Sequence, residues 1–284
     1  MLTGIVSNCW KTQLDAGLPL DDLLAEASRR GYRAVELRQT CLGEYETHGD
    51  HLPIAERLQN IPSRFPQIRF NVAIDVPFLT VPFDQSDPLF VAGCRAADAL
   101  AGESFPHLRL VDLSTSGEQL DRSDIGRIAA SVVKLVEAVT ELGGVLSIEQ
   151  SRQSWRSFHS VWDTARGLSG ANADRLRLCY DPCNLLIADR TTPEIDIDPD
   201  QVTASLTAEC VSMLHLKQRR AGDICPDIRD GAIDWREQAA ILRRIGFDGP
   251  ALFEVAPHGR VWKLLDDSIN YLRQQGLNIA GPDG

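Results

Sequence analysis

Short runs of apolar, often β-branched residues alternate with longer amphipathic stretches along most of the chain. The short runs favour strands because they span four to seven residues and end at polar residues or turn formers. Eight of them are predicted as strands: Thr3–Ser7, Ala34–Leu37, Arg69–Asp75, Leu108–Leu113, Val145–Glu149, Leu176–Tyr180, Val211–Leu216 and Ala251–Val255.

Between these runs the apolar residues recur with the spacing of a helix. Leu20, Leu23, Leu24 and Ala27 form an i, i+3, i+4, i+7 stripe, which predicts a helix over Leu20–Arg30. Similar patterns predict helices over Asp124–Leu142, Asp234–Ile245 and Leu264–Gln275. A glycine follows each of these four stretches directly, and glycine in that position is a helix stop signal.

Strands separated by helix-sized segments indicate right-handed βαβ units and a parallel sheet. Eight such units in 284 residues are about 35 residues each, which is typical of a (β/α)8 TIM barrel. We therefore expect an α/β fold with a single barrel domain over residues 1–284. A doubly wound sheet has the same alternation, but no G-x-G-x-x-G follows the first strand. Two polar stretches, Gly43–Asp50 and Asp189–Gln201, are predicted as loops at the C-terminal ends of strands.

The composition is that of an ordinary globular protein, with 43% hydrophobic and 24% charged residues. A net charge of −11 argues against a nucleic-acid partner, because it offers no general surface for a phosphate backbone. No apolar run approaches the roughly 20 residues of a membrane span, and the N-terminus lacks the basic start of a secretory signal. We expect a cytoplasmic protein without a membrane partner. The seven cysteines contain no C-x-x-C pair and are interpreted as free thiols.

Four of the later strands end on a side chain that binds protons or metals. The segments are LSIEQ with Glu149, LCYDPCN with Asp181, MLHLK with His215 and LFEV with Glu254. These residues follow one another at intervals of 32, 34 and 39 positions, each about one βα unit. The spacing predicts that all four lie on successive strands at one rim of the barrel.

Burying three carboxylates together is unfavourable unless a positive charge compensates them. One divalent metal ion would do so, and an oxygen-rich set with one imidazole suits Mn2+ or Mg2+, with Co2+ or Zn2+ tolerated. Taken alone, each residue has an ordinary explanation, such as a solvated glutamate or a hydrogen-bonded histidine. Four of them at barrel-unit spacing favour the metal site.

The residues at these strand ends resemble the xylose isomerase-like TIM-barrel superfamily of sugar and sugar-phosphate isomerases and epimerases. The similar segments are AVEL (34–37), IEQ (148–150), YDPCN (180–184), HLK (215–217) and the stretch from DGAIDW to LFEV (230–255). The likeness is most specific from Glu149 onward.

The resemblance implies one divalent metal ion held by Glu149, Asp181, His215 and Glu254. It also implies that the two glutamates flank the bound sugar and are the catalytic residues, one removing a proton alpha to the carbonyl and the other returning one. The metal would then stabilise the enediolate as a Lewis acid. The expected substrate is a carbohydrate or a polyol ketone, and the expected activity is that of an isomerase or epimerase.

Substrate contacts are predicted for Glu36, Asn184, Lys217 and Arg219. Lys217 shares a strand face with His215, although a salt bridge to a nearby carboxylate is an equal alternative. Glu36 ends the second strand and has an internal ion pair as its alternative. Asn184 occupies a position where several relatives have histidine. Gln218 stands where relatives often have aspartate, which departs from the family pattern.

Three other functions remain open. A metal-dependent dehydratase, as for inososes or dehydroshikimate, would use the same site but expel water. An endonuclease IV-like nuclease would need more histidines than this chain offers, and a non-catalytic binding barrel would not need buried carboxylates. The absence of a glycine-rich phosphate loop slightly favours an unphosphorylated substrate. Relatives are often dimers or tetramers, so the resemblance allows a homo-oligomer.

Overall fold

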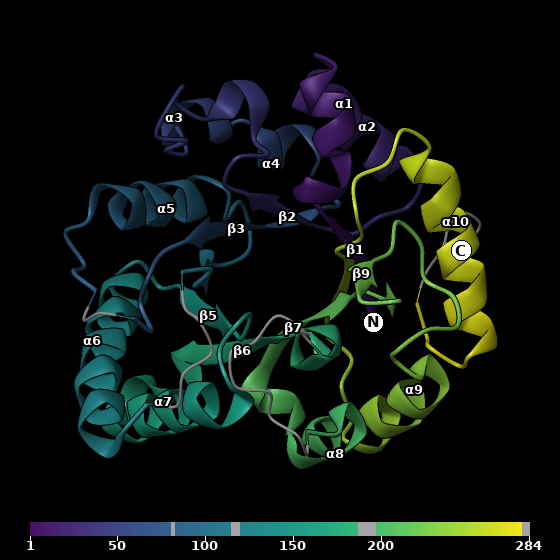
Figure 1. Cartoon of the computed structure of the whole chain (residues 1–284). Coiled ribbons are helices and arrows are strands. Elements are labelled where there is room, and N and C mark those ends of the chain that lie inside the picture. Colours follow the sequence, from purple (N-terminus) through teal and green to yellow (C-terminus); the bar gives the residue numbers. More distant parts are fainter. Residues whose placement is uncertain (81–82, 115–119, 187–196, 280–284) are drawn as a thin grey trace.

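Eight parallel strands close into a barrel in the computed structural model, which describes residues 1–80, 83–114, 120–186 and 197–279 (Figure 1). The order around the barrel is β1, β10, β7, β6, β5, β4, β3, β2, and all neighbours pair in parallel. The strands are β1 (Leu2–Val6), β2 (Ala34–Arg38), β3 (Arg69–Asp75), β4 (His107–Val111), β5 (Val145–Glu149), β6 (Leu176–Tyr180), β7 (Val211–Leu216) and β10 (Pro250–Phe253). The predicted barrel is confirmed, and every predicted strand agrees to within two residues.

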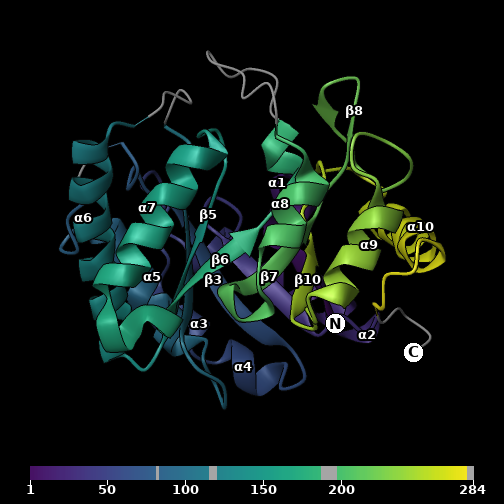
Figure 2. The same cartoon turned by 90° about the horizontal axis from the view of Figure 1, so that it is seen from below.

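Helices surround the barrel on the outside (Figures 1 and 2). They are α1 (Lys11–Asp15), α2 (Leu20–Arg29), α3 (Ala55–Leu58), α4 (Ile61–Arg64), α5 (Pro88–Ala99), α6 (Arg122–Glu141), α7 (Trp155–Leu168), α8 (Pro199–Ser205), α9 (Trp235–Arg244) and α10 (Val261–Gln274). The four predicted helices correspond to α2, α6, α9 and α10. None of the described helices is long and apolar enough to cross a bilayer.

Glycines end several of these helices as the sequence predicts. Gly31, Gly143 and Gly246 have φ values of 82°, 74° and 74° and follow α2, α6 and α9 within two residues. A side chain would strain this left-handed backbone, so glycine allows the chain to turn into the next segment at little cost.

The two predicted loops differ in outcome. The first contains a short 3-10 turn, η2 (Gly43–Tyr45). Most of the second, residues 189–196, lies outside the described residues. The prediction of a loop was wrong for the last three residues of this stretch, because α8 begins at Pro199. Asp198 caps this helix by accepting from the backbone nitrogen of Asp200 at 2.9 Å, and proline is favourable at the first helical position.

A small antiparallel hairpin follows β7 at the C-terminal end of the barrel. Its strands are β8 (Arg219–Arg220) and β9 (Asp223–Ile224). The two residues between them, Ala221 and Gly222, have φ values of 51° and 92°, which is the backbone of a tight two-residue hairpin turn. Arg219, the first residue of the hairpin, lies at the barrel mouth.

Candidate active site

The structure brings the four predicted side chains together at the C-terminal rim. Glu149 ends β5, Asp181 follows β6, His215 lies near the end of β7 and Glu254 follows β10, and these strands are consecutive in the barrel. All four residues are buried. One ligand atom from each residue lies within 4.8 Å of the others. The spacing argument therefore placed these residues correctly in space.

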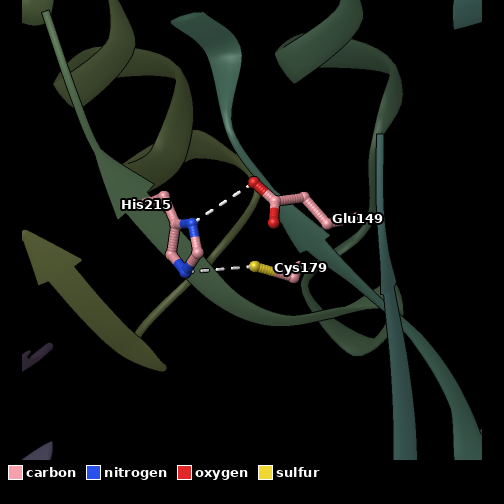
Figure 3. Close-up of side chains that lie close together, drawn as sticks. All are labelled: Glu149, Cys179 and His215. Carbon is pink, nitrogen blue, oxygen red and sulfur yellow. Dashed lines mark hydrogen bonds and ion pairs between the residues drawn. The ribbon is translucent and has the colours of Figure 1, made fainter. Parts of the chain in front are cut away.

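His215 stands at the centre of this cluster and presents a different nitrogen to each side. Its Nδ1 lies 3.1 Å from Glu254 Oε2 and 3.4 Å from Glu149 Oε1. Its Nε2 lies 3.3 Å from the Sγ of Cys179 and 3.6 Å from Glu36 Oε1. Figure 3 shows one ring nitrogen of His215 directed at Glu149 and the other at Cys179. Nδ1 is therefore the nitrogen that faces Glu149 and Glu254, while Nε2 faces Cys179 and Glu36, which orient the ring.

The donor set fits a divalent cation. Ligands that hold an ion from opposite sides at about 2.0–2.4 Å are about 4–5 Å apart, which agrees with the spread of these atoms. Glu149, Asp181 and Glu254 offer oxygens, and His215 offers Nδ1. Three carboxylates in a buried cluster also favour a cation electrostatically. A second group of Glu149, Cys179 and His215 meets the same spacing but contains one softer sulfur donor.

Lys217 is one of the cations that contact this cluster directly. Its Nζ lies 2.6 Å from Asp181 Oδ2 and 2.6 Å from Glu254 Oε2, and it donates to Asn184 Oδ1 at 3.3 Å. Asn184 in turn donates from Nδ2 to Glu149 Oε1 at 3.0 Å. Lys217 and Asn184 thus link three of the four site residues. Their roles as substrate contacts stay predictions.

Arg109 is the main residue of this region that the sequence interpretation missed. It lies on β4 with no solvent exposure, and its guanidinium binds both Glu36 and Glu149. Glu36 also accepts from Asn71 Nδ2 at 2.6 Å. A usable signal was present, because an arginine between two leucines in a buried strand needs a buried anion.

Glu36 and Arg38, near the end of β2, have separate partners. Glu36 binds Arg109, whereas Arg38 NH1 lies 3.2 Å from Glu254 Oε1. Glu36 has no exposed surface, and its prediction as a substrate contact stays untested. Its observed contacts join β2 to the cluster through Arg109 and His215.

Burial and neighbouring charges shift the protonation of the cluster in the metal-free protein. Burial raises the pKa of Glu149, but Arg109 and His215 outweigh this effect and leave the pKa below its ordinary value. The pKa of Glu254 falls well below its usual range because Lys217 and His215 outweigh burial. Asp181 differs, since burial dominates and raises its pKa. Both glutamates are therefore ionised near neutral pH.

The cluster opens into a cavity of about 540 Å³ at the barrel mouth. Glu149, Glu254, Asn184, Lys217 and Arg219 all line it. A cavity of this size is typical of a small-molecule site.

The chain belongs to the family described as xylose isomerase-like TIM barrel, whose model matches residues 91–275. No curated protein sequence matches the chain. Similar solved structures include the IOLI protein with a binding zinc atom, at 15% identity, covering 97% of this chain and 96% of that chain with a TM-score of 0.64. D-allulose 3-epimerase from Methylomonas sp., in complex with D-allulose, has 14% identity, 97% coverage of both chains and a TM-score of 0.65.

A third similar structure is a xylose isomerase domain containing protein from Salmonella typhimurium LT2. It has 13% identity and a TM-score of 0.67, and the match covers 96% of this chain and 97% of that chain. At these identities the likeness shows the shared barrel fold. The four metal-site candidates all lie within the segment that matches the family model.

Proposed function

We propose that this protein is a divalent-metal-dependent isomerase or epimerase of a sugar or a sugar-like hydroxy-carbonyl compound. The observation that carries the proposal is that Glu149 and Glu254 lie 3.4 and 3.1 Å from the same nitrogen, His215 Nδ1, and both line one cavity. The solved epimerase that holds D-allulose supports a carbohydrate substrate. The cytoplasmic location stays a prediction.

The two glutamates would move the proton. Arg109 and Lys217 favour their ionised forms, so either carboxylate is ready to accept a proton from the carbon alpha to the carbonyl. The glutamate that has taken a proton then becomes the acid for its return. Return of the proton to a neighbouring carbon gives isomerisation. Delivery of a proton to the original carbon by the opposite glutamate inverts the configuration of that carbon.

Glu149, Asp181, His215 and Glu254 would hold the metal ion. When bound, a divalent cation supplies Lewis-acid polarisation of the carbonyl and hydroxyl oxygens of the substrate. The oxygen-rich donors favour Mn2+ or Mg2+, and the zinc in the IOLI structure keeps Zn2+ among the ions to test. Asn184 and Lys217 would orient Glu149 and Glu254 and contact substrate hydroxyls.

Proton abstraction is tested by incubating the protein and Mn2+ with ketoses and inososes in deuterated water. We expect solvent deuterium to appear at carbon in a substrate, detected by mass spectrometry and NMR. Glu149→Gln and Glu254→Gln should each lower this exchange by about 10²- to 10⁴-fold, the range for loss of a general acid or base. Exchange retained in both variants would refute the two-glutamate scheme.

Glu137→Gln is the matched control, because Glu137 is exposed on α6, away from the cavity lining. It should exchange like the wild type. Product analysis separates the alternatives, since a dehydratase would release an unsaturated product instead of an isomer. Within the described residues, both clusters with metal-ligand spacing share Glu149 and His215, which does not favour a nuclease with three metal ions.

A further inference from the structure

The cavity lining has a charge opposite to that of the chain. The protein carries a net charge of −11, yet the cavity is lined by five cationic residues and two carboxylates. The cations are Arg38, Arg109, Arg152, Lys217 and Arg219. Glu36 and Asp181 lie next to this lining and pair with Arg109 and Lys217, so five cations meet four carboxylates.

Three of the five cations already have carboxylate partners. Arg38 and Lys217 bind Glu254, and Arg109 binds Glu36 and Glu149. Arg152 and Arg219 form no ion pair with any carboxylate in the described part of the chain. They are the two positive charges of the cavity that the metal cluster does not use.

Arg219 is held in place rather than free to extend into solvent. Its backbone nitrogen donates to Gln218 Oε1 at 3.0 Å, and its carbonyl oxygen accepts from the backbone nitrogen of Ala232 at 3.0 Å. Gln218 is fully buried, and its side chain also donates to the backbone oxygens of Arg229 and Ile233. The glutamine that departs from the family pattern therefore anchors the base of the hairpin. The position of Arg219 is fixed before a ligand arrives.

The guanidinium of Arg219 is only partly satisfied in this position. NH1 donates to the backbone oxygen of Gly222 at 2.7 Å, but Nε is buried without a hydrogen-bond partner among the described residues. A buried donor without a partner is unfavourable, and a ligand that accepts from it would relieve that cost. Guanidinium groups match the oxygens of phosphate and carboxylate better than single hydroxyls.

Arg152 approaches the same side of the mouth. It follows β5, whereas Arg219 follows β7, and only β6 lies between these two strands in the barrel. Arg152 is exposed and adds positive potential at the entrance, while Arg219 is half-buried and lines the same cavity.

We propose that the substrate carries an anionic group, either a phosphate or a carboxylate, which Arg219 and Arg152 bind at the mouth of the cavity. The proposal rests on the proposed function, because the reacting carbonyl would lie on the metal cluster while the anionic group lies on the hairpin side. A phosphate would overturn the expectation of an unphosphorylated substrate, whereas a carboxylate would leave it standing.

Binding is tested first without catalysis. Metal-free protein is titrated by calorimetry at low ionic strength with inorganic phosphate and, separately, with D-glycerate as a carboxylate probe. We expect at least one probe to bind the wild type, and Arg219→Gln to raise its Kd about 10- to 100-fold through loss of charge-assisted hydrogen bonds. Arg152→Gln should raise the Kd less, and the effect should shrink with added salt. The stronger probe identifies the class of anion.

Arg236→Gln is the matched control, since Arg236 is an exposed arginine on α9 that forms no ion pair in the described part of the chain. It should bind both probes like the wild type, and circular dichroism checks the fold of every variant. Failure of both probes to bind the wild type, or equal binding by folded Arg219→Gln, would overturn the proposal.

The catalytic arm separates this proposal from the proposed function. If deuterium exchange occurs, Arg219→Gln should lower kcat/KM more for a ketose with a phosphate or carboxylate than for the matching uncharged ketose, by about tenfold or more. Equal losses for both substrates would sink the anion site and leave the isomerase intact. Probe binding without exchange on any substrate would refute the isomerase and leave the anion site standing.

Discussion

Each end of the barrel contains a histidine, His215 fully buried and His107 partly buried, and in the metal-free protein their pKa values are shifted in opposite directions. His215, at the C-terminal end, is surrounded by Cys179, Glu149 and Glu254, and these groups outweigh burial and raise its pKa well above the ordinary value. His107, at the start of β4, lies 2.7 Å from Ser147 Oγ, and burial lowers its pKa to about 4. Burial alone therefore does not set the charge of a histidine in this barrel. The surrounding carboxylates decide it.

The cavities at the two ends also differ in the carboxylates that line them. The one at the N-terminal end has a volume of about 320 Å³, and Asp248 is the one carboxylate among its lining residues in the described part of the chain. Two of its polar side chains, His107 and Ser212, are linked through Ser147, whose Oγ lies 2.7 Å from each of them. This end follows the general rule that the N-terminal face of such a barrel serves stability, whereas the C-terminal face carries chemistry.

The largest expected difference between the two histidines is in metal binding. His215→Gln removes one of the four proposed ligands, so we expect the affinity for Mn2+ to fall more than about 100-fold, beyond the range for loss of a ligand's partner. His107→Gln should bind Mn2+ like the wild type. The measurement is Mn2+ titration of chelator-treated protein, followed by metal analysis after dialysis. If folded His215→Gln bound Mn2+ with unchanged affinity, the proposal that His215 is a metal ligand and His107 is not would be wrong.

The next largest effect concerns the buried arginine. Arg109→Met leaves Glu36 and Glu149 buried without their cation, so we expect a loss of about 3–5 kcal/mol in the free energy of unfolding. Urea denaturation measures this loss. Adding Glu36→Met should restore part of the stability, because one of the two unpaired buried charges is then removed.

Arg177 provides the control at the opposite end. Its Nε donates to the backbone oxygen of Asp174 at 3.1 Å in an exposed position, so Arg177→Met should cost less than about 0.5 kcal/mol. Equal costs for the two arginine variants would contradict the view that the C-terminal end holds a charge network and the N-terminal end does not.

The smallest expected effect is the pH dependence that arises from His107. Its pKa is lower in the folded protein than in the unfolded chain, so the unfolded state binds more protons between about pH 4 and 6.5. Stability therefore falls as the pH falls through this window, by on the order of 1 kcal/mol because His107 is partly exposed. His107→Gln should flatten this slope in urea denaturation at pH 4.5 and 7. An unchanged slope would show that other groups cause it.

The pattern of residues along the chain determined the barrel and much of the site. Short apolar runs and helical patterns, with glycine after the helices, depend on neighbours in sequence, so the eight strands and four of the described helices were predictable to within a few residues. Glu149, Asp181, His215 and Glu254 were predictable together because one βα unit brings each strand end to the same rim. The start of α8 was missed because proline and aspartate favour loops as well as helix starts.

Only the tertiary structure decided which charges meet inside the barrel. Arg109 and Glu36 are 73 positions apart, and no local pattern relates them. Their contact depends on barrel closure and on the strand register, which sets the side chains that lie at the same height along the barrel axis. The opposite pKa shifts of His107 and His215 depend on the same two features. Electrostatic interactions between buried groups vary steeply with distance and burial, and those quantities exist only once the chain has folded.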